Sequence, residues 1–126
     1  MKKYLHGATP TESGFADGVA VPALGLVWAE ASAIDGATGR RVPEAGTIAE
    51  ETRVCLVRLG ETLAEAGYAL SDVVKVNCYL AADEDRAEFW TAFDEVLAPG
   101  PYPVRITQVG GVAGDARVLL DAVAAR

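Results

Sequence analysis

The chain has 126 residues, of which 51% are hydrophobic, and it carries a formal net charge of −7. This length suits one domain over residues 1–126, and the hydrophobic content excludes a disordered chain. The acidic balance, with no run of Lys or Arg longer than two residues, argues against a nucleic-acid-binding surface. No apolar stretch approaches the ~20 residues of a membrane span, and no signal-peptide core follows Met1. We therefore expect a cytoplasmic protein that binds neither membranes nor nucleic acids.

The first third of the chain is predicted to form short strands, because its β-favouring residues are interrupted by Pro and Gly. The strands are expected at residues 3–6, 19–21 and 24–31, with a loop through Gly14 after the first. Pro22-Ala23 joins the second strand to the third.

A helix is predicted to begin at Thr47. Thr47 and Glu50 have the spacing of a capping box, in which each side chain accepts a hydrogen bond from a free backbone N–H group. Apolar residues then recur at helical spacing, and Gly67 is a suitable residue to end the helix. One stripe of this helix is therefore expected to face a core.

The second half of the chain continues with a strand at residues 73–80. Lys75 and Asn77 are expected on one face of it, with Val74, Val76, Cys78 and Leu80 on the other. Asp83 or Asp85 is predicted to cap a second helix that ends near Leu97. Strands at residues 104–109 and 116–124 complete the chain.

The order of elements is thus β-β-β-α-β-α-β-β, which indicates an α+β fold with two helices on one face of a sheet. An acidic monomer would not leave the other face bare, so we expect oligomerisation through it. No cluster of His, Cys, Asp and Glu has metal-ligand spacing, and no glycine-rich phosphate loop is present. We therefore predict neither a metal nor a cofactor.

Several segments resemble the reactive intermediate deaminase (Rid, or YjgF-like) family, once labelled endoribonuclease L-PSP. They are Thr38-Gly39, Asp72-Val73-Val74-Lys75-Val76, Trp90-Thr91-Ala92-Phe93, Pro103-Val104-Arg105 and Asp121-Ala122-Val123-Ala124. The resemblance covers nearly the whole chain. It implies a six-stranded, mostly antiparallel sheet with two helices on one face (a chorismate-mutase-like fold). It also implies a barrel-like homotrimer with ligand clefts between subunits.

The resemblance assigns Arg105 to the carboxylate of a small-molecule substrate, and a guanidinium fork suits that task. Thr107 matches a position whose backbone carbonyl helps to hold a water molecule. The alternative for Arg105 is a salt bridge between subunits or a place on the surface.

Other positions depart from the family pattern. Leu119 stands where relatives that hydrolyse C=N bonds carry a catalytic glutamate. Phe15 replaces an aromatic hydroxyl, Ala29-Glu30 replaces Ser-Gly, and Ala87 replaces an asparagine. These positions belong to the expected substrate cleft, but most of its polar groups are missing.

Two acidic residues could replace the missing base. Asp121 lies two residues beyond Leu119 and so on the same strand face, although it could have a structural role. Glu30 could supply a base, point outward, or form an ion pair with Arg105 that weakens acid binding.

Two functions remain open. One is a hydrolase that deaminates small imine or enamine acids, with Arg105 as the binding residue and Glu30 or Asp121 as the base. The other is a non-hydrolytic protein of the same fold, which binds a ligand or isomerises or cyclises an imine-like intermediate. A ribonuclease has little support from an acidic chain with one histidine.

Overall fold

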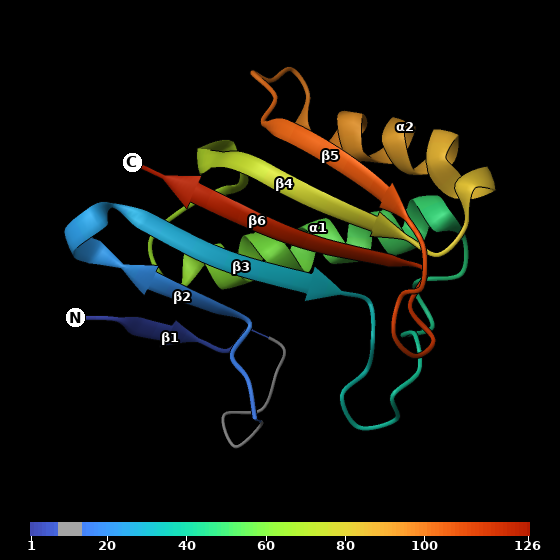
Figure 1. The fold of residues 1–126 in the computed structure, drawn as a ribbon, viewed down its shortest axis with the longest axis horizontal. Helices are drawn as coiled ribbons and strands as arrows, with labels where there is room; N and C mark the ends of the chain where they lie inside the picture. The colour runs from blue at the N-terminus through green and yellow to red at the C-terminus, as the bar shows by residue number, and fades with distance from the viewer. Residues whose placement is uncertain (8–13) are drawn as a thin grey trace.

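The computed structural model of the protein describes residues 1–7 and 14–126. The predicted loop before Gly14 includes residues 8–13, which lie outside the described residues. The strands and α-helices follow in the predicted order (Figure 1): β1 Lys3–Leu5, β2 Gly18–Val21, β3 Leu26–Ser32, α1 Ile48–Ala64, β4 Val73–Leu80, α2 Arg86–Leu97, β5 Val104–Val109 and β6 Val118–Ala125.

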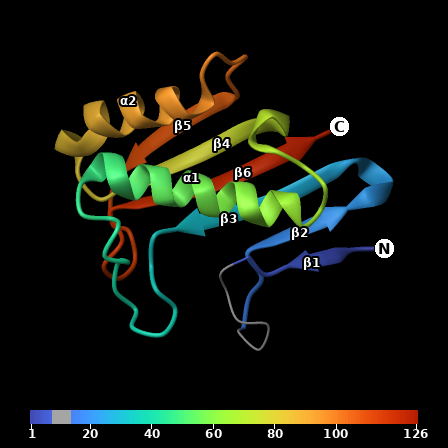
Figure 2. The ribbon, with the colours of Figure 1, turned by 180° about the vertical axis from the view of Figure 1, so that it is seen from behind.

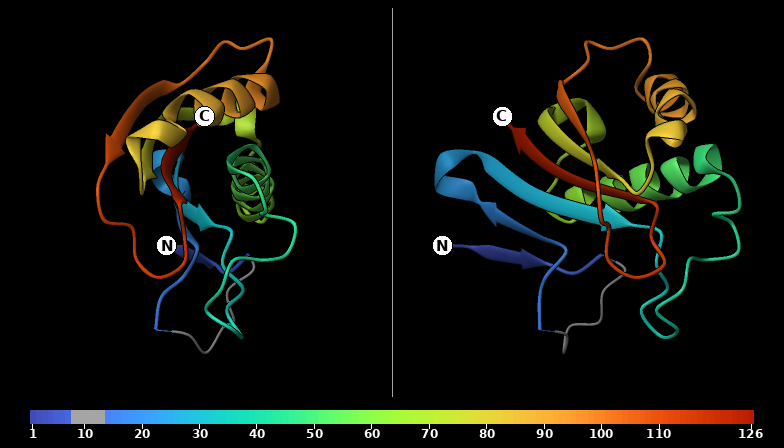
Figure 3. Two further views of the ribbon diagram at one scale, coloured as in Figure 1. Left: turned by 90° about the vertical axis from the view of Figure 1, so that its right-hand side faces the viewer. Right: turned by 45° about the vertical axis from the view of Figure 1, so that its right-hand side comes forward.

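The strands form one sheet in the order β1-β2-β3-β6-β4-β5. Every neighbouring pair is antiparallel except β4 and β5, which run parallel. Both helices lie on the same side of the twisted sheet, as Figure 2 and the end-on view of Figure 3 show. The predicted α+β fold is confirmed, and β1 and β5 are the two edges of the sheet.

Helix α1 begins and ends as predicted. The Glu50 N–H donates to Thr47 Oγ1 at 3.1 Å, and the Thr47 N–H donates to Glu50 Oε1 at 2.9 Å. Gly67 has a φ of +80°, and the following Tyr68 N–H donates back to the carbonyl of Leu63 at 3.0 Å. These contacts satisfy backbone groups that a helix leaves free at its ends.

Strand β4 follows the predicted alternation except at its start. Val76, Cys78 and Leu80 are buried under the helices, but Val74 is 47% exposed. A register shift between Val73 and Lys75 reverses the alternation there, because an extra residue in one strand turns the next side chain to the opposite face. The prediction for Val74 was wrong for this reason.

Helix α2 starts directly after Asp85, one of the two predicted cap positions, but without the expected side-chain cap. Residues Asp83–Asp85 form a separate 3₁₀ turn, and the side chain of Asp85 makes no capping hydrogen bond. The Asp83 carboxylate instead accepts a hydrogen bond from Arg86 Nε at 2.9 Å. Of the strands, β3 starts later than expected, because Pro22–Leu24 forms a 3₁₀ turn, and β6 starts at Val118.

The face of the sheet opposite the helices is uncovered within one chain. Cross-strand register places one row of side chains across it: Tyr4, Val19, Trp28, Val123, Lys75 and Val104. The next row contains Glu30, Asp121, Asn77 and Ile106. Trp28 is 42% exposed and Val104 is 62% exposed. A largely apolar row of this kind is typical of an interface.

The apolar row indicates burial between chains, and the family resemblance implies three of them, so we expect chains of 13.1 kDa to form a trimer of about 39 kDa. Trp28→Glu should dissociate it, because the substitution places a charge within the buried interface. Val57→Glu is the control, since Val57 is exposed on α1, on the helix side of the sheet. Sedimentation velocity at micromolar concentration checks both variants, and a monomeric parent protein would contradict the expectation.

Candidate functional site

Arg105 lies on the edge strand β5 and points toward the helix layer. It pairs in register with Val76, which is buried under the helices. Its guanidinium carbon lies 5.1 Å from the ring centroids of both Trp90 and Phe93 on α2. Arg105 Nη1 also donates to Asp94 Oδ1 at 2.9 Å. Two aromatic rings and a carboxylate thus hold the guanidinium in place.

Thr107 fixes one of these rings. Its hydroxyl oxygen accepts a hydrogen bond of 3.0 Å from Trp90 Nε1. The resemblance had assigned a role to the backbone carbonyl of Thr107, which stays a prediction. The hydrogen bond between the side chains of Thr107 and Trp90 has a separate role: it links β5 to α2 and orients the indole beside Arg105.

A pocket of about 400 Å³ opens beside this arginine. Its walls are Phe93, Asp94, Tyr102, Pro103 and Arg105. Among the residues that the structure describes, Asp94 is the only hydrogen-bond partner of the guanidinium. The other N–H groups of Arg105 can therefore bind an incoming carboxylate.

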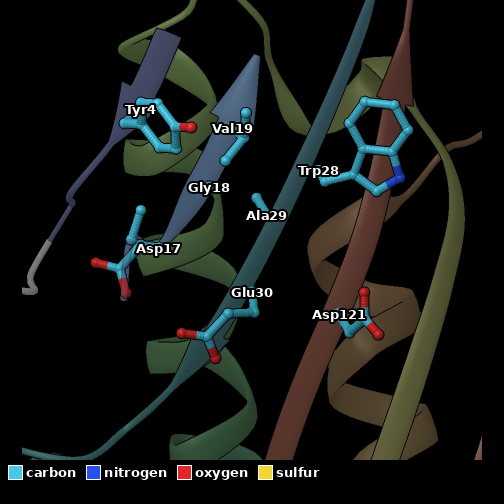
Figure 4. Close-up of a pocket in the computed structure, with 9 residues that line it drawn as sticks. Tyr4, Asp17, Gly18, Val19, Trp28, Ala29, Glu30 and Asp121 are labelled. Carbon is cyan, nitrogen blue, oxygen red and sulfur yellow. The ribbon is translucent and has the colours of Figure 1, made fainter. Parts of the chain in front are cut away.

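Glu30 and Asp121 lie on the opposite face of the sheet. They are cross-strand partners on β3 and β6, and they line a second pocket of about 300 Å³ together with Tyr4, Asp17 and Trp28. Figure 4 shows Asp17 and Glu30 beside each other at one end of this pocket. Within one chain, the proposed bases and Arg105 therefore point in opposite directions.

The charge state of Glu30 is unusual. Burial raises the pKa of its carboxyl group to about 7. The charge of Asp17, a side-chain hydrogen bond with Asp17, and the charge of Asp121 add to the rise. A carboxyl group with a pKa near neutrality can both accept and donate a proton at physiological pH.

The remaining predicted site residues are spread over the molecule. Leu119 lies on the same face as Asp121, as expected, with Ser32 and Tyr79 as its cross-strand partners. Ala29 is buried on the helix side and borders the Glu30 pocket. Phe15 is 60% exposed before β2, and Ala87 is exposed on the first turn of α2.

Sequence reasoning missed Asp94 and Tyr102, and it named Trp90 only within a segment that resembles the family. The spacing of Trp90 and Asp94 was an available signal, because residues four apart share one helix face. The ion-pair partner that the sequence analysis considered for Arg105 was Glu30. The structure places Asp94 in that role instead.

No group of three or more potential metal ligands occurs in the described part of the chain. Among the same residues, no helix is long and apolar enough to cross a membrane.

Comparisons with known proteins support the expected family. A family model described as Endoribonuclease L-PSP matches residues 26–126. The mitochondrial protein mmf1 of Schizosaccharomyces pombe is 40% identical over 86 residues, which are 68% of this chain and 51% of the relative. The chain thus spans about half the length of the curated relatives that it matches. Because their names place them in mitochondria, the expected cytoplasmic location stays a prediction.

Solved structures share the fold at low sequence identity. Yeast Mmf1 is 18% identical with a TM-score of 0.85, covering 100% of this chain and 99% of the other. The protein YyfA of Yersinia pestis, described as of unknown function and a member of the conserved Rid family, is 17% identical. Its TM-score is 0.84, with 100% of each chain covered.

The raised pKa of Glu30 predicts how stability depends on pH. Between its ordinary value of 4.5 and about 7, the folded protein holds a proton that the unfolded chain releases. Stability should therefore fall as the pH rises through this window. Glu30→Gln keeps a hydrogen-bond donor for Asp17 and removes the titration. The variant should match the parent near pH 4 and exceed its free energy of unfolding by about 1–2 kcal/mol at pH 8, after allowance for solvent screening.

Urea unfolding at several pH values measures this difference. Glu61→Gln, at an exposed position on α1, is the control for the removal of one carboxylate. If the Glu30→Gln and parent curves run parallel from pH 4 to 8, Glu30 does not titrate as described.

Proposed function

The chain belongs to the endoribonuclease L-PSP family, also called the Rid or YjgF-like family, and on that premise we propose that it binds small carboxylic acids through Arg105. We further propose that it hydrolyses the C=N bond of small imine or enamine acids, with Glu30 as the proton carrier. The observation that carries the proposal is the guanidinium of Arg105, held between α2 and β5 at the wall of an open pocket.

The contacts around Arg105 support carboxylate binding. Its side chain is 25% exposed, so part of the guanidinium reaches the pocket while the remainder packs on Trp90 and Phe93. Ordering the side chain before the ligand arrives lowers the entropy cost of binding. A planar fork of N–H donors can then make two parallel hydrogen bonds to the carboxylate.

Hydrolysis requires a second chain, because Glu30 and Arg105 face opposite sides of the sheet. The Arg105 pocket lies at the β5 edge, and the Glu30 pocket lies toward the β1 edge. A head-to-tail ring that buries the uncovered face of each sheet can place the β5 edge of one chain against the uncovered face of its neighbour. We propose that in such a homotrimer Arg105 of one chain and Glu30 of the next line one cleft.

The reaction needs few catalytic groups once the substrate is bound in the correct orientation. Arg105 fixes the carboxylate, which leaves the iminium carbon open to water. As water attacks, its proton passes to the Glu30 carboxylate. The resulting carboxylic acid returns the proton to the nitrogen. The C–N bond then breaks while the Glu30 carboxylate takes the proton of the newly added hydroxyl group, and the products are a keto acid and ammonia, to which that proton passes as ammonia leaves.

A second function is favoured by the separation of Arg105 from the proposed bases on the same chain. Leu119 supplies no acid–base group, and Glu30 and Asp121 lie away from Arg105 within the chain. We call the carboxylate-binding guanidinium of Arg105 the carboxylate clamp. A protein with this clamp alone would bind its ligand without hydrolysing it, or would isomerise or cyclise an imine-like intermediate. The variants below distinguish the two functions.

Arg105→Ala should weaken the binding of 2-oxobutanoate by about 10- to 100-fold, because a charge-assisted hydrogen bond is lost. The control is Arg86→Ala, since Arg86 also lies 5.1 Å from the Trp90 ring but pairs with Asp83. Isothermal titration calorimetry measures both. Equal affinities of Arg105→Ala and the parent would refute the clamp.

Glu30→Gln should lower the rate of ammonia release from freshly generated 2-iminobutanoate by about 100-fold or more, the usual contribution of a general acid–base group. The parent rate should rise through pH 7, since the ionised carboxylate accepts the proton. Leu119→Glu should add little to the parent rate if Glu30 is the base. An unchanged rate in Glu30→Gln, with a large gain in Leu119→Glu, would show that the parent lacks a working base.

A further inference from the structure

Asp94 gives the Arg105 pocket a second charge that a simple carboxylate site does not need. Its Oδ1 lies 2.9 Å from Arg105 Nη1, and both residues line the same pocket of about 400 Å³. The pair carries one positive and one negative charge, so the pocket wall presents both signs side by side.

The two partners are exposed to different degrees. The Asp94 side chain is 55% exposed, whereas the Arg105 side chain is packed on the rings of Trp90 and Phe93. Only one carboxylate oxygen of Asp94 has a hydrogen-bond partner among the described residues. The second oxygen can therefore accept a hydrogen bond from a ligand while the pair stays intact.

This arrangement disfavours a ligand with a carboxylate as its only charge. Such an anion gains a bond to Arg105 but approaches the negative charge of Asp94, in a chain with a net charge of −7. A ligand that also carries a cationic nitrogen replaces this repulsion with attraction. An α-amino acid and a protonated α-imino acid both place that nitrogen one carbon away from the carboxylate.

We propose that Asp94 is a specificity-determining residue that binds the cationic nitrogen of the ligand while Arg105 binds its carboxylate. The pocket then selects zwitterions over plain carboxylic acids. This inference rests on the proposed carboxylate clamp, and it adds a partner for the nitrogen that neither Glu30 nor Asp121 can supply within the same chain.

The pocket walls are consistent with a small zwitterion. Phe93 and Pro103 offer apolar surface, and Tyr102 adds an aromatic ring with a hydroxyl group. A volume of about 400 Å³ falls in the lower part of the usual range for small-molecule sites. The charged pair therefore sets the orientation of the ligand, and the remaining walls enclose its short side chain.

The test compares L-2-aminobutyrate with butanoate, which share a carbon skeleton and differ by the ammonium group. Calorimetry on the parent should give about tenfold tighter binding of L-2-aminobutyrate, from one charge-assisted hydrogen bond. Asp94→Asn should weaken L-2-aminobutyrate about tenfold and leave butanoate unchanged or tighter. Glu95→Gln is the matched control on the same helix, because Glu95 is near Arg53 rather than Arg105.

The outcomes separate this inference from the clamp. If the parent binds both ligands equally, or if Asp94→Asn shifts both affinities in the same direction, Asp94 is only a counter-ion of Arg105 and the inference fails alone. If butanoate binds Arg105→Ala as well as the parent, or if neither ligand binds, the clamp fails and the inference fails with it.

Discussion

The alternation of side chains along each strand is the constraint that decides where Arg105, Glu30 and Asp121 can act. Successive residues of a strand face opposite sides of a sheet, so register decides which groups can meet. Arg105 pairs with buried Val76 and turns toward the helices, whereas Glu30 and Asp121 pair with each other on the uncovered face. No rotamer change brings these groups together, because the sheet lies between them. Any reaction that uses both must therefore use two chains.

The contact between α2 and β5 turns an edge strand into a binding platform. Thr107 holds Trp90, while Trp90 and Phe93 support the guanidinium of Arg105. Each contact joins a helix residue to a strand residue, so the platform exists only after the two elements have packed. The same packing places Asp94 beside Arg105. A loss of affinity after a change at Trp90 would thus report a misplaced arginine rather than a missing ligand contact.

Local patterns predicted the parts of the fold that depend on neighbouring residues. Helix α1 was found because its apolar stripe and the Thr47–Glu50 capping box are local signals. The start of α2 after Asp85 was also found, but the side-chain cap was not formed, and Asp83 pairs with Arg86 instead. The side of the sheet to which Arg105 points was not predictable, since it depends on the long-range register with β4. Asp94 was missed for a related reason, because its proximity to Arg105 depends on how α2 packs on β5.

Subunit mixing tests most directly whether the site is completed between two chains. At a substrate concentration below saturation, Arg105→Ala should be about 10- to 100-fold and Glu30→Gln about 100-fold less active than the parent. After both are unfolded and refolded together in equal amounts, random assembly of a head-to-tail ring should restore about a quarter of the parent activity, because one interface in four combines an intact Arg105 with an intact Glu30. If the mixture has no more activity than the separate variants, the two residues do not act across a subunit boundary.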